Sequence, residues 1–234
     1  RRRAKGRNAM TRIRLVAGFL TVGLWTLLSR VAGFARDILM AAYLGAGPVT
    51  DAFFVAFSLP NMFRRFFAEG AFNSAFVPMF AKKVEAGDGA EAFARDAFWG
   101  MVAVLLVFST LAVIAMPFLV WAMAAGFAGT ERFDLAVAYG RVAFPYIFFI
   151  SLTALLSGMM NAVGRFTAAA AAPVLLNVVF VAAMVMADRA GWDMGMALAW
   201  AVPVGGVVQM AVLWVAVRRA GFAMRFQRPR RRPN

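Results

Sequence analysis

The sequence predicts an all-α, polytopic membrane protein with six transmembrane helices. Of its 234 residues, 63% are hydrophobic, and the mean hydropathy of +0.74 lies well above that of soluble globular domains. Apolar stretches of about 20 residues or more, enough to cross a hydrocarbon core about 30 Å thick, follow one another along the chain. Spans of this length must be helical, because strands would need a closed barrel with alternating polarity, which the sequence lacks.

Short connectors separate the six predicted spans, and each connector contains glycine, as expected for tight turns. Prolines lie inside the last five spans, where we expect them to kink the helices of a protein that bends between states. These prolines are Pro60, Pro117, Pro145, Pro173 and Pro203. The spans themselves cover residues 15–43, 51–80, 98–123, 135–160, 168–187 and 196–217.

The net charge of +14 is concentrated in the two ends of the chain. Fourteen of the 25 lysines and arginines lie within residues 1–14 and 218–234, which we interpret as basic cytoplasmic tails around a six-helix lobe at 15–217. Basic tails also bind nucleic acid, but tails that adjoin hydrophobic spans are typical of topology signals that touch anionic membrane lipids. We therefore expect no nucleic-acid partner. The first methionine is Met10, so residues 1–9 are set aside as upstream or added sequence.

The basic residues also predict an orientation. If both tails and the connectors after the second and fourth spans share one side, that side carries 17 lysines and arginines. The other side carries only Arg132 and Arg189. The positive-inside rule then places both termini in the cytoplasm.

Polar residues of the first span share one face of the predicted helix. Arg30 and Asp37 nearly coincide on this face, and Arg36 lies about 120° from Arg30. Each charge at membrane depth costs about 2.5–3.5 kcal/mol on insertion scales, so we expect the two arginines to line a wet interior. This arrangement favours an anion pathway. An arc of about 120–140° holds Thr26, Ser29, Arg30, Gly33, Arg36 and Asp37.

A second charged cluster lies in the span at 51–80. Arg64 lies about 100° from Arg65, and Pro60 distorts the register, so geometry leaves open which of the two arginines faces inward. On an ideal helix an arc of about 80° holds Asp51, Ser58, Asn61, Arg65 and Glu69.

Each of these charges has a second interpretation that the sequence leaves open. Asp51 also suits a first helical turn, where the helix dipole favours acids. One of Arg64 and Arg65 can extend to the cytoplasmic headgroups, and Glu69 can pair with Arg65. Four arginines exposed to lipid would nevertheless cost about 10–14 kcal/mol, so most must be solvated or paired. Internal ion pairing is one solution; the excess of arginine over carboxylate favours a multivalent anion instead, because guanidinium groups match diphosphate oxygens.

Composition excludes most catalytic chemistry. Without cysteine the chain has no disulfide and no thiolate metal site, and without histidine it lacks the usual zinc ligands and nucleophile–base pairs. No phosphate-binding loop of the G-x-x-x-x-G-K-[ST] type occurs. We expect no catalytic residues, no metal and no cofactor. Composition does not exclude an enzyme that uses carboxylate or lysine side chains.

Several sequence blocks carry a family resemblance. The two specific blocks are SRVAGFARD at 29–37 and TDAFFVAFSLPNMFRRFFAEGAFNSAFVPMF at 50–80. Three weaker blocks follow in order: FPYIFFISLTALLSGMMNAVGRF at 144–166, APVLLN at 172–177 and LAWAVPVGGVVQ at 198–209. With this order and spacing, the chain resembles the MurJ/MviN family, the lipid II flippases of bacterial peptidoglycan synthesis.

The resemblance implies an exporter fold of the multidrug/oligosaccharidyl-lipid/polysaccharide type, working by alternating access in the bacterial inner membrane. The implied substrate is lipid II, an undecaprenyl diphosphate that carries a disaccharide-pentapeptide and moves from the cytoplasmic to the outer leaflet. Family members have two six-helix lobes around a cationic cavity, followed by helices that form a groove for the lipid tail. This chain matches the first lobe alone, so we expect a C-terminal lobe in the same polypeptide as its partner.

Matched motif by motif, the family's functional residues fall on the charges identified above. Arg30 and Arg36 take the place of cavity arginines in helix one, and Arg64 that of an arginine in helix two, with Arg65 beside it. These four would bind the diphosphate. The gate or cavity acids would be Asp37, Asp51, which corresponds to an acid near the outward gate, and Glu69, in the cytoplasmic half of helix two.

Other functions stay open at this stage. A relative that moves another polyprenyl-diphosphate glycan or a small anion would need the same arginines. A membrane scaffold whose arginines only pair internally would carry the same charges without transport, and so would an inactive fragment.

Overall fold

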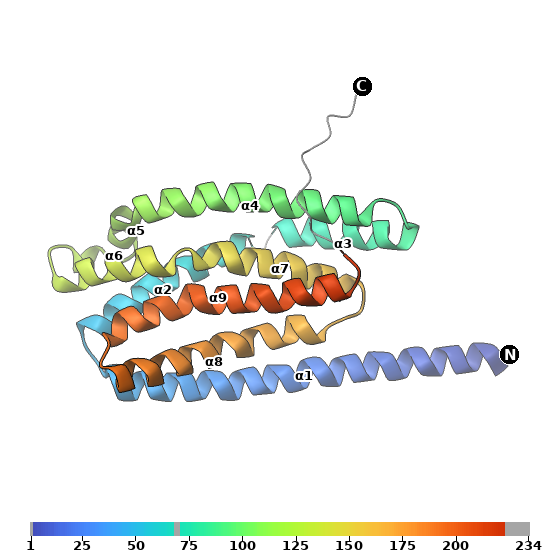
Figure 1. Cartoon of the computed structure of the whole chain (residues 1–234), viewed down its shortest axis with the longest axis horizontal. Helices are drawn as coiled ribbons and strands as arrows, with labels where there is room; N and C mark the ends of the chain where they lie inside the picture. Colours follow the sequence, from blue (N-terminus) through green and yellow to red (C-terminus); the bar gives the residue numbers. More distant parts are fainter. Residues whose placement is uncertain (1, 68–70, 223–234) are drawn as a thin grey trace, which may run out of the picture.

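Residues 2–67 and 71–222 are described by a computed structural model. They form an elongated bundle in which the long helices lie along a common axis (Figure 1). The first helix, α1 (Arg2–Leu44), includes the predicted basic tail at 1–14 from Arg2 onward and extends well past the rest of the bundle. Within the described ranges there is no strand. The remaining helices are α2 (Pro48–Phe67), α3 (Ala71–Ala86), α4 (Ala90–Ile114), α5 (Met116–Met123), α6 (Glu131–Ala143), α7 (Tyr146–Ala162), α8 (Thr167–Ala190) and α9 (Met194–Arg219), with a short 3₁₀ helix at Ala125–Phe127.

The helices follow the order of the predicted spans. The second, third and fourth spans are each divided in two, as α2 with α3, α4 with α5, and α6 with α7, whereas α1, α8 and α9 are single helices. Four of the described segments are long and apolar enough to cross a membrane: Ala90–Ile114, Glu131–Ala162, Thr167–Ala190 and Met194–Arg219. The all-α membrane fold is therefore confirmed, while the count of six spans stays a prediction for the first two.

Two of the five prolines lie where a span is divided, and three do not. Pro117 stands in the first turn of α5, and Pro145 lies between α6 and α7, where the backbone N–H groups of Ile147 and Phe148 bond three residues back instead of four. A proline removes one backbone donor and clashes with the preceding turn, which explains these interruptions. Pro60, Pro173 and Pro203 lie inside helices that the structure draws as continuous.

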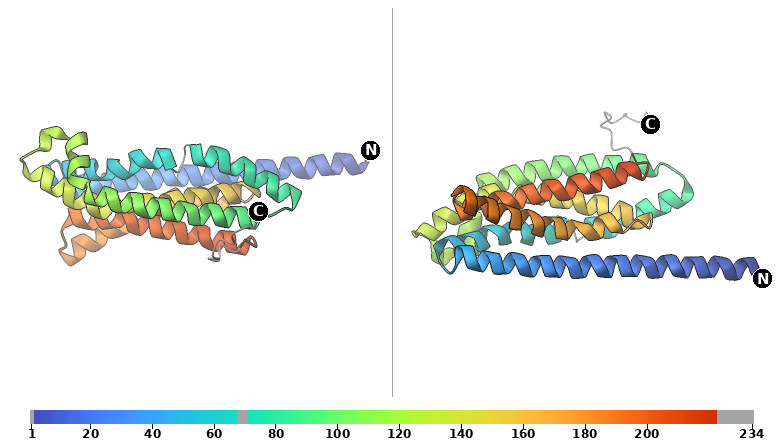
Figure 2. Two further views of the ribbon diagram at one scale, coloured as in Figure 1. Left: turned by 90° about the horizontal axis from the view of Figure 1, so that it is seen from above. Right: turned by 60° about the horizontal axis from the view of Figure 1, so that its bottom comes forward.

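Basic residues are concentrated at one end of the bundle. The start of α1, the turns at 87–89 and 163–166 and the end of α9 lie at one end in all views (Figures 1 and 2). The connectors at 45–47, 124–130 and 191–193 lie at the other end. The described part of the first end carries Lys82, Lys83, Arg165, Arg218 and Arg219. This sorting matches the distribution on which the predicted orientation rests.

Packing inside the bundle divides into two apolar clusters, one toward each end. The first joins Phe53, Met116 and Phe144 with residues of α8 and α9, and the second joins Phe80, Leu105 and their neighbours on α7 and α9. α1 packs mainly against α8. On the outer side, α4 exposes a row of large apolar side chains, as expected for a surface that meets lipid chains: Val104, Leu106, Val107 and Leu111.

Helices α7 and α9 approach closely at Gly206. A Cβ atom placed there would lie 2.8 Å from Cδ2 of Tyr146 and 2.9 Å from Cβ of Phe149. The second atom is attached directly to the α7 backbone and has little freedom to move. Small residues at such crossings let membrane helices come together, and here the absence of a side chain allows α9 to contact the α7 wall of the bundle.

We expect Gly206→Ala to destabilise the protein, because overpacking costs about 1–3 kcal/mol, more than the gain of up to about 1 kcal/mol in helix propensity. The melting temperature in detergent, followed by size-exclusion chromatography after heating, should fall by about 2–4 °C. Gly100→Ala on α4 is the matched control, because a Cβ atom added there would have no atom within 4 Å and stability should hold or rise. Equal behaviour of the two variants would contradict tight α7–α9 packing.

Candidate anion-binding cavity

A cavity of about 940 Å³ lies between α1, α2, α7, α8 and α9. Three arginines line it, and none of the lining residues is an aspartate or a glutamate. Its walls therefore carry positive charge without a carboxylate, as far as the described residues show. The lining includes Arg36 from α1; Phe57, Ser58, Asn61, Met62, Arg64 and Arg65 from α2; Tyr146, Thr153, Ser157 and Asn161 from α7; Leu176 and Asn177 from α8; and Gln209 from α9.

Three neighbours hold the guanidinium group of Arg36 in place. Its Nε and Nη2 atoms donate hydrogen bonds to Oδ1 of Asp37 at 3.0 and 2.7 Å, and Nη1 donates to Oδ1 of Asn177 at 3.0 Å. The group also lies 5.7 Å from the centre of the Phe180 ring, a cation–π distance. The arginine side chain is 23% exposed and that of Asp37 is 63% exposed. Arg36 is thus fixed at the cavity wall, while Asp37 faces outward.

Asn177 connects α8 to α1 at this point. Its side-chain amide donates a hydrogen bond to the backbone oxygen of Ser29 at 3.1 Å, while its oxygen accepts the bond from Arg36. A Cβ atom on Gly33 would lie 3.5 Å from the same amide nitrogen, so α8 passes directly over this glycine. With only 6% of the residue exposed, Asn177 is buried and its amide is satisfied on both sides.

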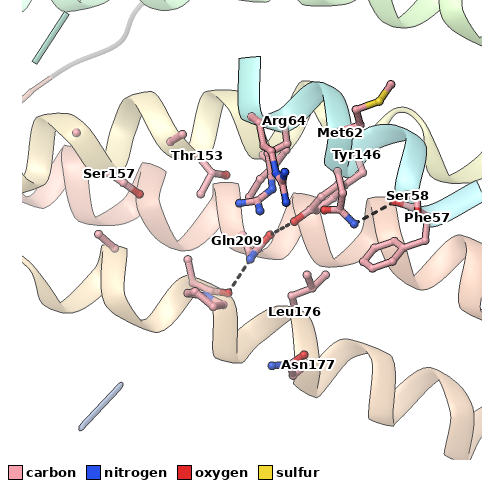
Figure 3. A pocket seen from close by; sticks show the side chains of 18 of the residues that line it. Phe57, Ser58, Met62, Arg64, Tyr146, Thr153, Ser157, Leu176, Asn177 and Gln209 are labelled. Atoms are coloured by element: carbon pink, nitrogen blue, oxygen red, sulfur yellow. Dashed lines mark hydrogen bonds between the residues drawn. The ribbon is translucent and has the colours of Figure 1, made fainter. Parts of the chain in front are cut away.

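The other two arginines come from the last turns of α2. Arg64 is half-buried and Arg65 is exposed, yet both line the cavity. Figure 3 shows the Arg64 side chain reaching from α2 toward Gln209 and Tyr146. The question that Pro60 left open is answered by this placement, since both neighbours contribute to the wall.

A polar patch from α7 and α9 faces these arginines. The Gln209 amide donates to the backbone oxygen of Ala172 at 2.7 Å, and the Tyr146 hydroxyl donates to Oε1 of Gln209 at 3.5 Å (Figure 3). Tyr146 and Gln209 are both buried. Thr153 and Ser157 add hydroxyl groups to the α7 wall. The cavity thus offers neutral donors and acceptors beside its cationic groups.

Three further predicted site residues, Arg30, Asp37 and Asp51, are not part of the cavity lining. Arg30 is exposed on α1 and is not part of the lining. Asp51, at the start of α2, forms an ion pair with Arg132 of α6 at 3.1 Å between Oδ2 and Nε. This pair joins α2 to α6 near the end of the bundle opposite the start of α1. Glu69 lies outside the described residues.

The sequence pattern did not predict three residues of the cavity wall: Asn177, Gln209 and Tyr146. For the first two, the sequence nevertheless contains an indication. Each is a lone amide in a predicted span that is otherwise nearly apolar, and such residues in membrane helices mark internal contacts. Among the described residues no group of three or more acidic or other metal-ligating side chains comes together.

Comparisons with known proteins agree with the fold and with the sequence blocks. The family described as "Lipid II flippase MurJ" matches residues 40–233. A "Probable lipid II flippase MurJ" of Rhizobium tropici is 49% identical over 94% of this chain and 43% of its own length. A "Lipid II flippase MurJ" of Burkholderia cenocepacia is 47% identical over 85% of this chain and 39% of its own length. These relatives extend the match to residues that precede position 40.

A solved structure supports the same fold. The "Lipid II flippase MurJ, inward closed conformation" superposes with a TM-score of 0.71 at 24% identity, covering 86% of this chain and 42% of that one. The chain therefore spans about two fifths of the length of the relatives it matches. On the family match and the relatives' identities together, the chain belongs to the MurJ family of lipid II flippases.

Proposed function

We propose that this chain is the N-terminal lobe of a lipid II flippase and supplies part of a site for the substrate's diphosphate. The observation that carries the proposal is the cavity, which three arginines and no described carboxylate line inside a membrane-spanning bundle. Guanidinium groups bind phosphate oxygens through paired, charge-assisted hydrogen bonds. An anion of two or more charges would offset the cost of holding these cations away from bulk water.

The arginines differ in how far they are prepared for a ligand. Asp37, Asn177 and Phe180 hold Arg36 in one orientation, so binding there loses little side-chain freedom. Arg65 is exposed and can adjust to the ligand. We assign Arg36 the fixed part of the diphosphate site, with the half-buried Arg64 beside it and Arg65 as an adaptable third cation.

Arg30 and the three acids complete the proposal. Arg30 and Asp37 are exposed on α1, and we propose that this side of α1 meets the second half of the full-length flippase, where Arg30 would join the diphosphate site. Asp51, through its pair with Arg132, would hold α2 to α6 at one gate. Glu69 would act in the cytoplasmic half of the second span. In this proposal the acids tune or latch the cavity between its states.

The proposed setting is the bacterial inner membrane, with both termini in the cytoplasm and the basic tails against anionic lipids. The segregation of basic residues at the end that holds the start of α1 and the end of α9 supports this orientation. We propose transport without catalysis, driven by the membrane potential, since moving one charge through 100 mV supplies about 2.3 kcal/mol. The partner in this scheme is a C-terminal lobe in the same polypeptide.

One observation favours a second function. The Arg36 guanidinium already contacts a carboxylate and an amide, which is what an internal ion pair in a non-transporting scaffold would show. Exchanging the charges of Arg36 and Asp37 separates the two functions. A scaffold tolerates the exchange because the pair is kept, whereas a diphosphate site loses its cation from the cavity wall.

The first test is rescue of cells depleted of their own lipid II flippase. We expect the chain joined to a family C-terminal half to restore growth, and Arg30→Ala, Arg36→Ala or Arg64→Ala in that fusion to abolish rescue at near-normal protein abundance. Arg189→Ala is the control, because this exposed arginine lies at the far end of α8 and should have no effect. Growth of the Arg36 and Arg64 variants would rule out an essential phosphate role.

The second test measures binding directly on the chain in detergent. Titration with undecaprenyl diphosphate, followed by ³¹P NMR, should show saturable binding that Arg36→Gln and Arg64→Gln each weaken about 10- to 100-fold, because a hydrogen bond to a charged group contributes about 1.5–3 kcal/mol. Undecaprenol, which lacks the diphosphate, is the control ligand and should not compete. Unchanged affinity in both variants would favour the scaffold.

Asn177 offers a third test, as a positioning residue that acts through Arg36. Asn177→Leu removes the bond to Arg36 and the bond to α1, and we expect diphosphate affinity to fall about tenfold or less. The specific readout is the rate at which phenylglyoxal modifies Arg36, measured by peptide mass spectrometry. It should rise severalfold while the rate at Arg64 stays constant. A parallel rise at both arginines would indicate general loosening of the bundle instead.

A further inference from the structure

A second cavity of about 940 Å³ lies at the basic end of the bundle, between the start of α8, the end of α9 and Thr21 of α1. The two cavities use different faces of α8, because Thr167, Ala168 and Ala171 line this one while the anion-binding cavity takes residues at 169, 172, 173, 176 and 177. We call it the α8–α9 groove. Its remaining walls include Met160, Ala211, Val212, Val215 and Ala216.

Two arginines stand at the groove on an otherwise apolar surface. Nη1 of Arg165, in the turn before α8, donates to the backbone oxygen of Arg219 at 3.5 Å, which holds these two basic residues next to each other. Both residues are exposed. Across residues 2–67 and 71–222, neither arginine forms an ion pair with a carboxylate. The pair is therefore available to an external anion.

The depth of the arginines restricts what that anion can be. Thr167 begins one membrane-spanning segment and Arg219 ends another, so both arginines lie where a span meets the headgroup layer. The alanines and valines of α8 and α9 continue from this level into the bundle's hydrocarbon depth. A ligand that fits must therefore carry a negative charge at one end and apolar chain along the rest.

We propose that the α8–α9 groove binds an anionic diacyl phospholipid, with its phosphate on Arg165 and Arg219 and an acyl chain on the small apolar side chains between α8 and α9. This choice of ligand rests on the proposed orientation, in which the groove opens toward the cytoplasmic leaflet, where anionic lipids are concentrated. A free phosphate would use the arginines but leave the apolar walls uncovered. The site is distinct from the proposed diphosphate site and does not depend on it.

The test is photocrosslinking in nanodiscs that contain the full chain. Phosphatidylglycerol with a diazirine on its acyl chain is compared with the same probe on phosphatidylcholine, and crosslinked peptides are mapped by mass spectrometry. We expect the anionic probe to label peptides that cover 167–171 and 211–216 about tenfold more than the zwitterionic probe, a ratio consistent with two basic contacts at the membrane surface. Peptides from the exposed row on α4 should take both probes equally.

Matched variants separate the groove from surface charge in general. Arg165→Ala/Arg219→Ala should lose the preference for phosphatidylglycerol, whereas Lys82→Ala/Arg218→Ala, which removes two charges from the same end outside the groove, should keep it. Ala171→Trp keeps the arginines but fills the apolar floor, and labelling should fall there too. Equal loss in both double variants would overturn the proposal in favour of diffuse charge attraction.

Two further outcomes would also overturn it. Displacement of the anionic probe by undecaprenyl diphosphate at lower concentration than by phosphatidylglycerol would assign the groove to the transported lipid. Loss of labelling when the chain is joined to a family C-terminal half would show that protein covers the groove. Persistence of the preference in both experiments supports a phospholipid as the occupant.

Discussion

The cavity depends on how the structure keeps a guanidinium group fixed inside a largely apolar bundle. Asn177 makes this possible, because its single amide accepts a hydrogen bond from Arg36 and donates one to the backbone of Ser29. A charged group with no partner at this depth would cost several kcal/mol. The same two bonds also fix α8 against α1, with Gly33 leaving room for the contact. The same two hydrogen bonds of Asn177 therefore fix both the packing of α8 on α1 and the position of the Arg36 guanidinium group.

The distribution of opposite charges decides what this arrangement can do. An ion-pair scaffold needs a carboxylate for each cation, yet the described lining of the cavity has three arginines and no acid. Asp37 meets Arg36 from the exposed side, and Asp51 is engaged by Arg132 at the far end. Asp37 thus orients Arg36 and balances its charge from outside the lining, and Asp51 joins α2 to α6. The excess of arginine over acid in the described lining is the physical reason to favour an anion as the ligand of this cavity.

The sequence predicts those properties that depend on one helix at a time. Apolar length predicted the order of the spans, and the charge counts predicted that the start of α1 and the end of α9 lie at one end of the bundle. The polar stripes included Arg36, Arg64 and Arg65, which line the cavity, and their role in binding stays a prediction. The sequence could not predict which helices pack against each other. A helical wheel puts Arg30 and Arg36 in one arc, but α8 lies against the side of Ser29 and Gly33, so Arg36 is held and Arg30 is exposed. The partner of Asp51 stands 81 positions later and had no local signal.

Helix α8 separates two environments, and its composition explains how. Its first turns are nearly all alanine, so the helix is thin where the cavity lies on one face and the α8–α9 groove on another. Polar contacts differ between the faces: Asn177 and the backbone oxygen of Ala172 serve the cavity, while the groove has an apolar floor below Arg165. Small residues let α8 pack closely against both α1 and α9, so its groove face and its Arg36 contact belong to one tightly packed helix. A lipid seated in the groove would therefore act on the same helix that positions Arg36.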